Sequence, residues 1–226
     1  MRETYFDTRA NLQAYFDRTA AAAWEQLTSE APVSRIRQTV REGRDAMRRI
    51  LLDGLPADLS GARVLDAGCG TGQASIELAA RGAKVIAVDI SPSLLDVARS
   101  RTPAALSDRI EYHAGDMLDP YLGEIDHTLA MDSLIHYQPE DCARALAALK
   151  TRTRGTLVFT MPPKTPLLTA MHWSGKVFPK GNRSPGIVPM SARQLSRELV
   201  PHGCSLRELG RVQRGFYICD ALEVRR

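Results

Sequence analysis

The spacing of hydrophobic positions changes at about residue 60, which divides the chain into two differently patterned parts. In the first part, apolar residues recur at intervals of three, four and seven, which predicts an amphipathic helix. The apolar positions of this helix are Ile36, Val40, Met47, Ile50 and Leu51. Ser34 is a residue type that caps helix N-termini, so we expect the helix to begin there. Residues 1–60 are therefore predicted to form a helical arm.

The polar face of the same helix is rich in arginine. Its basic residues are Arg35, Arg37, Arg41, Arg44, Arg48 and Arg49. Two interpretations are open: a solvated face on a helix that docks through its apolar stripe, or contact with an anionic membrane surface or acidic partner. We favour the first, because solvated charged faces are the usual property of amphipathic helices.

Residues 61–226 alternate between short apolar runs and amphipathic segments, and are predicted to form one α/β domain. The expected strands are 62–68, 84–89, 109–116, 127–132, 155–160, 205–213 and 216–224, and the expected helices are 73–82, 91–101, 139–150 and 191–203. This order predicts a mostly parallel, doubly wound, seven-stranded sheet that closes with an antiparallel strand. Ligands of such sheets bind beyond the carboxyl ends of the strands.

The segment 162–190 interrupts this alternation after the fifth strand. It is rich in proline and combines basic with apolar side chains, without an acidic residue. Its basic residues are Lys164, Lys176, Lys180 and Arg183, and its apolar ones include Leu167, Leu168, Met171, Trp173, Val177 and Phe178. Long connections inside compact domains are often functional lids, so we favour a substrate-covering insertion over a plain surface loop.

Composition narrows the class of protein. The chain has 226 residues, 44% of them hydrophobic, with a net charge of +4 and a pI near 9.0. No window approaches 18 uninterrupted apolar residues, and the first residues lack the apolar core of a secretion signal, so we expect a cytoplasmic protein. The basic residues are not interleaved with aromatic ones as a nucleic-acid site would require. The cysteines lack CxxC spacing, which favours reduced thiols over a disulfide framework or a zinc site.

The most specific motif is VLDAGCGTG, in which Gly68, Gly70 and Gly72 directly follow a predicted strand. Glycine lets the backbone turn tightly and approach a ligand closely. The spacing GxGxG differs from the GxGxxG that accommodates a dinucleotide pyrophosphate. Asp66 stands inside the motif, where a carboxylate would repel an anion and attract a cationic ligand. These two features disfavour an NAD-linked dehydrogenase.

Two further acids end the next two strands. Asp89 stands where doubly wound nucleotide sites place the carboxylate that binds ribose hydroxyls. Asp116, in AGDM, could accept a hydrogen bond from an adenine amino group. Ile90 and Met117 could supply apolar contact to the ring. Three acids at consecutive strand ends favour a ligand site over a purely structural turn.

The combination DAGCGTG, VDIS and GDM resembles the class I S-adenosylmethionine-dependent methyltransferases, over about Ala62 to Val224. The resemblance implies a Rossmann-like fold, S-adenosyl-L-methionine as cofactor and S-adenosyl-L-homocysteine as product. It assigns the methionine moiety to the glycine loop, ribose to Asp89 and adenine to Asp116. The implied cofactor-binding residues are Asp66, Gly68, Cys69, Gly70, Gly72, Asp89, Ile90, Asp116, Met117 and Asp132.

Segments outside that core resemble the magnesium-protoporphyrin IX O-methyltransferase family of chlorophyll and bacteriochlorophyll synthesis. They are AYFDR with Trp24, LTSEAPVSRIRQTVREGRD, MDSLIHYQ and TPLLTAMHWSGKVFPKGNRSPGIVP. The resemblance implies esterification of one porphyrin propionate, with Tyr15 and His136 as the catalytic pair. The implied substrate-binding residues are Tyr15, His136, Lys164, Met171, His172, Trp173, Lys176 and Phe178. It further implies partnership with the large magnesium-chelatase subunit, possible contact with the photosynthetic membrane, and magnesium as part of the substrate, with no protein-bound metal.

A propionic acid titrates near the Glu reference, ~4.3, so the acceptor is already a carboxylate at neutral pH. A general base is therefore not needed. We expect His136 to orient the propionate or to stand beside the porphyrin metal, Tyr15 to close the site, and Asp132 to fix the loop next to the cofactor. Two alternatives stay open: methylation of another small aromatic acceptor, such as a quinone precursor, and a non-catalytic porphyrin carrier.

Overall fold

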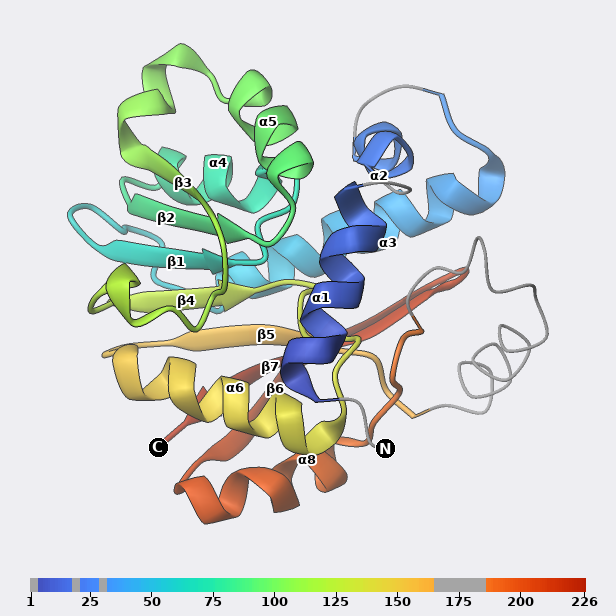
Figure 1. Ribbon diagram of the computed structural model, residues 1–226, viewed down its shortest axis with the longest axis vertical. Coiled ribbons are helices and arrows are strands. Elements are labelled where there is room, and N and C mark those ends of the chain that lie inside the picture. The colour runs from blue at the N-terminus through green and yellow to red at the C-terminus, as the bar shows by residue number, and fades with distance from the viewer. Residues whose placement is uncertain (1–3, 18–20, 29–31, 165–185) are drawn as a thin grey trace.

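The computed structural model describes residues 4–17, 21–28, 32–164 and 186–226. It contains a seven-stranded sheet in the order β3-β2-β1-β4-β5-β7-β6 (Figure 1). The strands are β1 (Arg63–Ala67), β2 (Lys84–Asp89), β3 (Ile110–Ala114), β4 (His127–Ala130), β5 (Leu157–Met161), β6 (Ser205–Arg214) and β7 (Tyr217–Arg225). Strands β1 to β5 pair in parallel, and β7 pairs antiparallel with both β5 and β6. The predicted fold class is confirmed.

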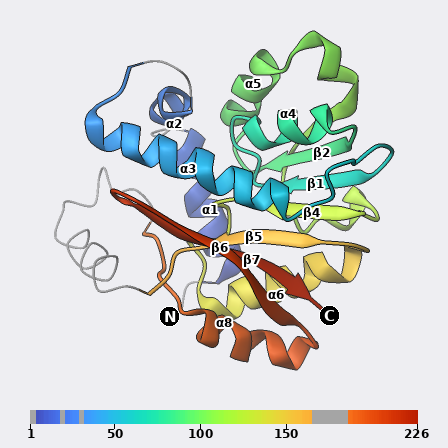
Figure 2. The ribbon, with the colours of Figure 1, turned by 180° about the vertical axis from the view of Figure 1, so that it is seen from behind.

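The α-helices of the described residues are α1 (Tyr5–Tyr15), α2 (Ala21–Leu27), α3 (Arg35–Asp53), α4 (Gln73–Ala80), α5 (Pro92–Arg101), α6 (Pro139–Arg152) and α8 (Ala192–Leu199). Some of them cover the two faces of the sheet. Helices α3 and α4 lie on one face and α6 and α8 on the other, as the two opposite views show (Figures 1 and 2). The predicted N-caps are confirmed, since Ser34 accepts from the Arg37 amide and Ser91 from the Leu94 amide.

Alternation along the central strands supplies one hydrophobic core to each face. Leu65 and Ile86 pair in register and join the core under α6, whereas Val64 and Val85 join the core under α3 and α4. Successive strand side chains point to opposite faces, so both faces can be apolar only in a sheet covered on both sides. The strands are therefore buried on both faces, and polar side chains gather at their carboxyl ends.

The arm helices lie against this scaffold in different ways. Helix α1 passes the end of the sheet at which the central strands finish (Figure 1), and its Leu12 is 3% exposed within the core. Helix α3 packs on the closing hairpin so closely that a Cβ at Gly43 would lie 2.8 Å from Cδ1 of Tyr217. Met47 and Leu51 of its predicted apolar stripe are buried. Ile36 is 57% exposed, so that first position of the stripe was predicted wrongly.

The two ends of the insertion meet just beyond β5. An isolated parallel bridge joins Pro163 to Met190, and the Lys164 amide donates to the Met190 carbonyl oxygen at 3.2 Å.

The turn of the closing hairpin lies one residue further along the chain than predicted. Gly215 has φ +53° and Phe216 belongs to the turn, whereas the sequence pattern predicts that Phe216 begins the last strand.

Within the described ranges, none of the helices is long and apolar enough to cross a membrane.

Candidate active site

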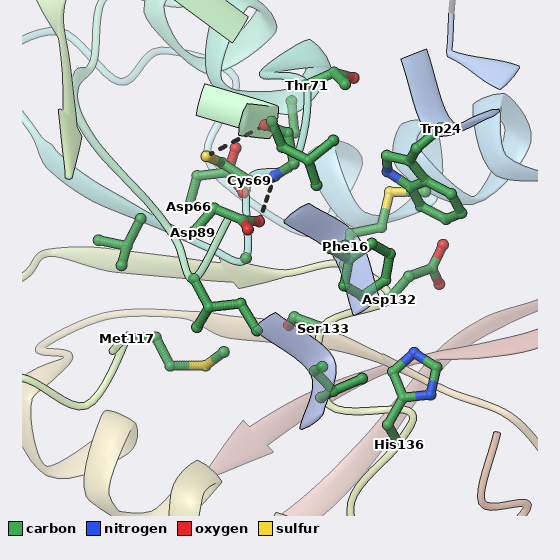
Figure 3. Close-up of a pocket in the computed structure, with 18 of the residues that line it drawn as sticks. Phe16, Trp24, Asp66, Cys69, Thr71, Asp89, Met117, Asp132, Ser133 and His136 are labelled. Carbon is green, nitrogen blue, oxygen red and sulfur yellow. Dashed lines mark hydrogen bonds between the residues drawn. The ribbon is translucent and has the colours of Figure 1, made fainter. Parts of the chain in front are cut away.

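A pocket opens at the carboxyl ends of the central strands, between the sheet and the N-terminal arm (Figure 3). The arm contributes Tyr5, Leu12, Phe16, Trp24, Arg44 and Arg48, and the sheet's end contributes Asp66, Gly68, Cys69, Gly70, Asp89, Ile90, Asp116, Met117, Asp132, Ser133 and His136. All but one of the residues predicted to bind the cofactor are therefore brought together. The exception is Gly72, which instead caps the start of α4 in a left-handed conformation. Cofactor binding by these residues stays a prediction.

The glycine loop has the backbone conformation that its sequence predicts. Gly68, Gly70 and Gly72 have φ values of +83°, +53° and +78°, which side-chain-bearing residues rarely adopt. At Gly68 the requirement is also steric, because a Cβ there would lie 2.4 Å from the Cβ of Ser133. The loop after β1 and the loop after β4 therefore touch, and this contact forms the floor of the pocket.

Asp66 is the buried acid of the motif. Its side chain is 1% exposed and Oδ2 accepts a hydrogen bond from the Ser75 hydroxyl at 2.6 Å. Burial raises the pKa of Asp66 to about 7, against the opposing effect of that hydrogen bond. The carboxyl is thus poised to gain or lose its charge near neutral pH.

Asp89 holds the glycine loop from the end of β2. Its Oδ2 accepts from the Gly70 amide at 2.8 Å, and its Oδ1 accepts from the Ser91 amide at 2.9 Å. Burial raises the pKa of Asp89 to about 6 although these hydrogen bonds favour the ionised form. Each carboxylate oxygen can accept a further hydrogen bond. The Ser91 hydroxyl in turn donates to Asp17, beyond the end of α1, at 2.6 Å.

Asp116 is held by two residues of α1 that the sequence did not single out. The Tyr5 hydroxyl donates to Oδ1 at 2.9 Å, and Nη1 of Arg9 donates to Oδ2 at 2.6 Å. The Tyr5 ring also stacks on Tyr137, with ring centroids 4.8 Å apart. These partners lie more than a hundred positions away in sequence, so no local pattern could have paired them.

Asp132 follows β4 and has φ +55°, a strained value for a residue other than glycine. Its Oδ1 accepts from the hydroxyls of Thr160 and Tyr217, both at 3.1 Å, and its Oδ2 forms an ion pair with Arg44. This acid joins β4, β5, β7 and α3. These contacts hold the loop after β4 against its neighbours, and the predicted contact of Asp132 with the cofactor stays a prediction.

His136 lies at the opposite end of the pocket from the glycine loop (Figure 3). Its Nδ1 is 3.3 Å from the carbonyl oxygen of Gly186, and the Phe16 ring approaches it edge-on with centroids 6.5 Å apart. A carbonyl oxygen can only accept, so the contact places the imidazole proton on Nδ1. Burial lowers the pKa of His136 below its usual range, which favours the neutral ring at pH 7. The free Nε2 of this tautomer is an acceptor.

The other residues predicted to bind substrate are less closely gathered. Tyr15 ends α1 and is half-buried, and it is not among the residues lining the pocket, whereas its neighbour Phe16 is. Lys164 is exposed and lies outside the lining. Met171, His172, Trp173, Lys176 and Phe178 lie outside the described residues. The roles of all these side chains stay predictions.

Comparison with known families matches both halves of the domain. The family described as "Methyltransferase domain" matches residues 64–155, and "Magnesium-protoporphyrin IX methyltransferase C-terminus" matches residues 130–226. The magnesium-protoporphyrin O-methyltransferase of Rhodobacter capsulatus is 51% identical over 226 residues, which is 100% of each chain. This chain belongs to the magnesium-protoporphyrin O-methyltransferase family. The predicted family is confirmed.

More distant family members agree. The chloroplastic magnesium protoporphyrin IX methyltransferase of Arabidopsis thaliana is 27% identical over 94% of this chain and 69% of its own length. The crystal structure of magnesium protoporphyrin IX methyltransferase from Synechocystis PCC 6803 with bound SAH superposes with a TM-score of 0.80. It is 26% identical and covers 96% of this chain and 98% of its own.

Proposed function

We propose that this chain transfers a methyl group from S-adenosyl-L-methionine to a propionate carboxylate of magnesium-protoporphyrin IX, and so forms the monomethyl ester. The observation that carries the proposal is 51% identity along the whole chain to a magnesium-protoporphyrin O-methyltransferase. The similarity includes the arm and the insertion, which lie outside the methyltransferase core and should determine the choice of acceptor. A quinone precursor as acceptor would leave this full-length similarity unexplained.

The pocket's own chemistry fits the cofactor. Ser133 has a buried hydroxyl without a hydrogen-bonding partner in the described part of the chain, and it lies beside the glycine loop. Asp89 keeps acceptor capacity for ribose hydroxyls, and the three acids at the strand ends suit a cationic ligand. When bound, S-adenosylmethionine supplies an electrophilic methyl group on a sulfonium. The chain's task is to hold the reactants in line, and orientation of this kind can supply about 7–11 kcal/mol of barrier reduction.

His136 is better suited to the porphyrin metal than to the carboxylate. With its proton directed at Gly186, its Nε2 is an acceptor, and an ionised carboxylate also only accepts. Those two groups cannot hydrogen-bond to each other, whereas neutral imidazole is a common metal ligand. We therefore assign His136 to axial contact with the magnesium, and Tyr15, whose hydroxyl can donate, to the carboxylate.

The direct test is incubation of the protein with magnesium-protoporphyrin IX and S-adenosylmethionine, followed by mass spectrometry. The expected result is the gain of one methyl group, with metal-free protoporphyrin reacting more slowly. A wild-type protein that binds the porphyrin tightly without forming the ester would instead be a carrier.

The role of His136 is tested by His136→Ala. We expect a lower kcat with affinity for S-adenosylhomocysteine within a few-fold of wild type. We also expect loss of the wild-type shift in the absorption spectrum that axial ligation of the porphyrin metal produces. A spectral shift that survives in His136→Ala would exclude axial contact.

We propose that the insertion 162–190 covers the porphyrin, because its basic and apolar residues suit a flat apolar anion. Replacing Lys164, Lys176 and Lys180 together by Gln should raise the KM for the porphyrin. An unchanged KM would remove the insertion from the substrate site.

We further propose a peripheral membrane contact and hand-over of the porphyrin from the large magnesium-chelatase subunit. The membrane contact is supported by the exposed start of α3, where Ile36 is 57% exposed between exposed Arg35 and Arg37. Co-sedimentation with anionic vesicles, reduced in Ile36→Asp, tests it, and equal sedimentation of both proteins would exclude this surface. Hand-over would be excluded if the chelatase subunit left the rate of ester formation unchanged.

A further inference from the structure

Among the described residues that line the pocket, the arginines stand on the wall formed by α3. The sheet's end carries the acids Asp66, Asp89 and Asp116, and the opposite wall carries the guanidinium groups of Arg44 and Arg48. The side chains of Arg44 and Arg48 are each 14% exposed, but Arg48 has two carboxylate partners and Arg44 has one. A charged group held at this depth needs partners, and those partners show what it is positioned to do.

Two side chains fix the position of the Arg44 guanidinium. It lies 4.7 Å from the ring centroid of Trp24 on α2, in a cation–π contact. It forms an ion pair with Asp132, whose side chain is 5% exposed and is itself held by Thr160 and Tyr217. The Trp24 indole nitrogen lies 3.4 Å from the position that a Cβ on Gly70 would occupy. The guanidinium is thus preorganised beside the glycine loop.

Among the described residues, Arg44 has a hydrogen-bonding partner for one of its N–H donors only. A guanidinium has five N–H donors, and in the described part of the chain Arg44 uses one, from Nη1 to Oδ2 of Asp132. Arg48, one turn further along α3, differs because it donates to Glu77, Asp45 and Gln73. The unused N–H groups of Arg44 therefore form a planar fork at the pocket wall, which is the geometry that binds a carboxylate.

We propose that Arg44 binds a carboxylate of a bound reactant, and that Asp132 is its positioning residue. This inference rests on the proposed function, because both reactants of that reaction carry carboxylates: the amino-acid end of the cofactor and the propionates of the porphyrin. Neither α3 nor its arginines belong to the motif that defines the cofactor site. Through its ion pair with Arg44, the strained residue Asp132 would contribute to ligand binding by holding the guanidinium in position.

The charge change of the reaction limits which carboxylate suits this fork. Methyl transfer converts the reacting carboxylate into a neutral ester, so a strong ion pair to it would stabilise the ground state and slow the step. A carboxylate that keeps its charge carries no such penalty. The candidates are then the cofactor's α-carboxylate and the propionate that does not react.

The experiment compares Arg44→Met, Arg44→Lys and a matched control, Arg49→Met, whose arginine is exposed on the same helix. Binding of S-adenosylhomocysteine is measured by calorimetry, and the porphyrin KM is measured at saturating S-adenosylmethionine. We expect Arg44→Met to weaken one of the two by about tenfold to a hundredfold. Arg44→Lys keeps the charge and restores part of the loss, and Arg49→Met matches wild type. Losses confined to S-adenosylhomocysteine identify the α-carboxylate, and losses confined to the porphyrin identify a propionate.

Wild-type measurements protect the test against a variant that fails to fold. S-adenosylhomocysteine is compared with its decarboxylated analogue, and magnesium-protoporphyrin with its monomethyl ester. Equal binding within each pair overturns the inference, as does an Arg44→Met protein with both parameters within twofold of wild type. For Asp132, we expect Asp132→Asn to reduce this carboxylate preference and to be non-additive with Arg44→Met. If the losses of affinity in Asp132→Asn and Arg44→Met were additive in the double variant, Asp132 would not position Arg44.

The two proposals fail separately. Wild-type ester formation with no effect of Arg44→Met removes only the role of Arg44. Absence of ester formation, together with an Arg44-dependent preference for S-adenosylhomocysteine over its decarboxylated analogue, removes only the proposed acceptor.

Discussion

The pocket has two walls of different origin. The wall at the sheet's end consists of Asp66, the glycine loop, Asp89 and Asp116, all at or just beyond the ends of neighbouring parallel strands. The wall formed by the arm consists of Tyr5, Phe16, Trp24, Arg44 and Arg48, brought in by three helices. The first wall depends on short sequence spacing and the second on long-range contacts. The first wall contains the residues that we expect to bind the cofactor, and the second wall brings side chains of the arm to the same pocket.

The largest expected effect is a loss of unfolding free energy when the glycine loop of the first wall is changed. Gly68→Ala places a Cβ 2.4 Å from the Cβ of Ser133, in a residue whose φ is +83°. The left-handed conformation costs about 1–2 kcal/mol and overpacking adds about 1–3 kcal/mol, so we expect a loss of about 3 kcal/mol in unfolding free energy. Urea denaturation measures it.

Gly61→Ala is the matched control for this substitution. Gly61 has φ +78° and nothing within 4 Å of an added Cβ, so it should show only the backbone cost. Similar losses for the two variants would show that the contact between the loops after β1 and β4 relaxes freely.

Asp89→Ala removes the acceptor of two backbone amides as well as the predicted ribose contact. Hydrogen bonds to charged groups are worth about 1.5–3 kcal/mol each, so affinity for S-adenosylhomocysteine should fall by about a hundredfold. Calorimetric titration measures the loss. Asp96→Ala, with a side chain 77% exposed, is the control and should bind as wild type. If Asp89→Ala kept wild-type affinity for S-adenosylhomocysteine, Asp89 would not be the residue that binds the cofactor's ribose.

Asp66 makes the first wall sensitive to pH. Its folded pKa of about 7 lies above the unfolded value of ~3.9, so the folded state retains a proton between these limits. The unfolding free energy from this group is therefore highest below about pH 4 and falls as pH rises towards 7, by at most about 1.4 kcal/mol per pH unit. Asp66→Asn removes that slope. Denaturation curves of both proteins between pH 4 and 8 test it, and identical slopes would mean that Asp66 is ionised throughout.

The smallest expected effect concerns the second wall. Tyr5→Phe keeps the stack on Tyr137 but removes the hydrogen bond to Asp116, so S-adenosylhomocysteine affinity should fall by about fivefold to tenfold. Calorimetry measures it, with Tyr121→Phe as control, because Tyr121 is 96% exposed. A loss as large as that of Asp89→Ala would mean that the arm, and not only the sheet, forms the cofactor site.

The sequence predicted the sheet wall in detail because each of its parts depends on local spacing. A strand, a glycine turn and a helix start follow one another within VLDAGCGTG, and the strand ends of a parallel sheet must meet at one edge. The same reasoning failed at Ile36, since helical periodicity says which face is apolar but not how far the sheet beneath it extends.

The sequence by itself determined the fold class, the family, the glycine loop and the order of the acids. Only the tertiary structure decided which arginines of α3 line the pocket. Arg35, Arg37, Arg44 and Arg48 all belong to the polar face of one predicted helix, yet the first two are exposed and the last two line the pocket. The physical reason is that a helix's own pattern does not specify where its polar face meets another surface. At Arg44 that surface includes Trp24 on α2 and Asp132 after β4, which only folding brings together.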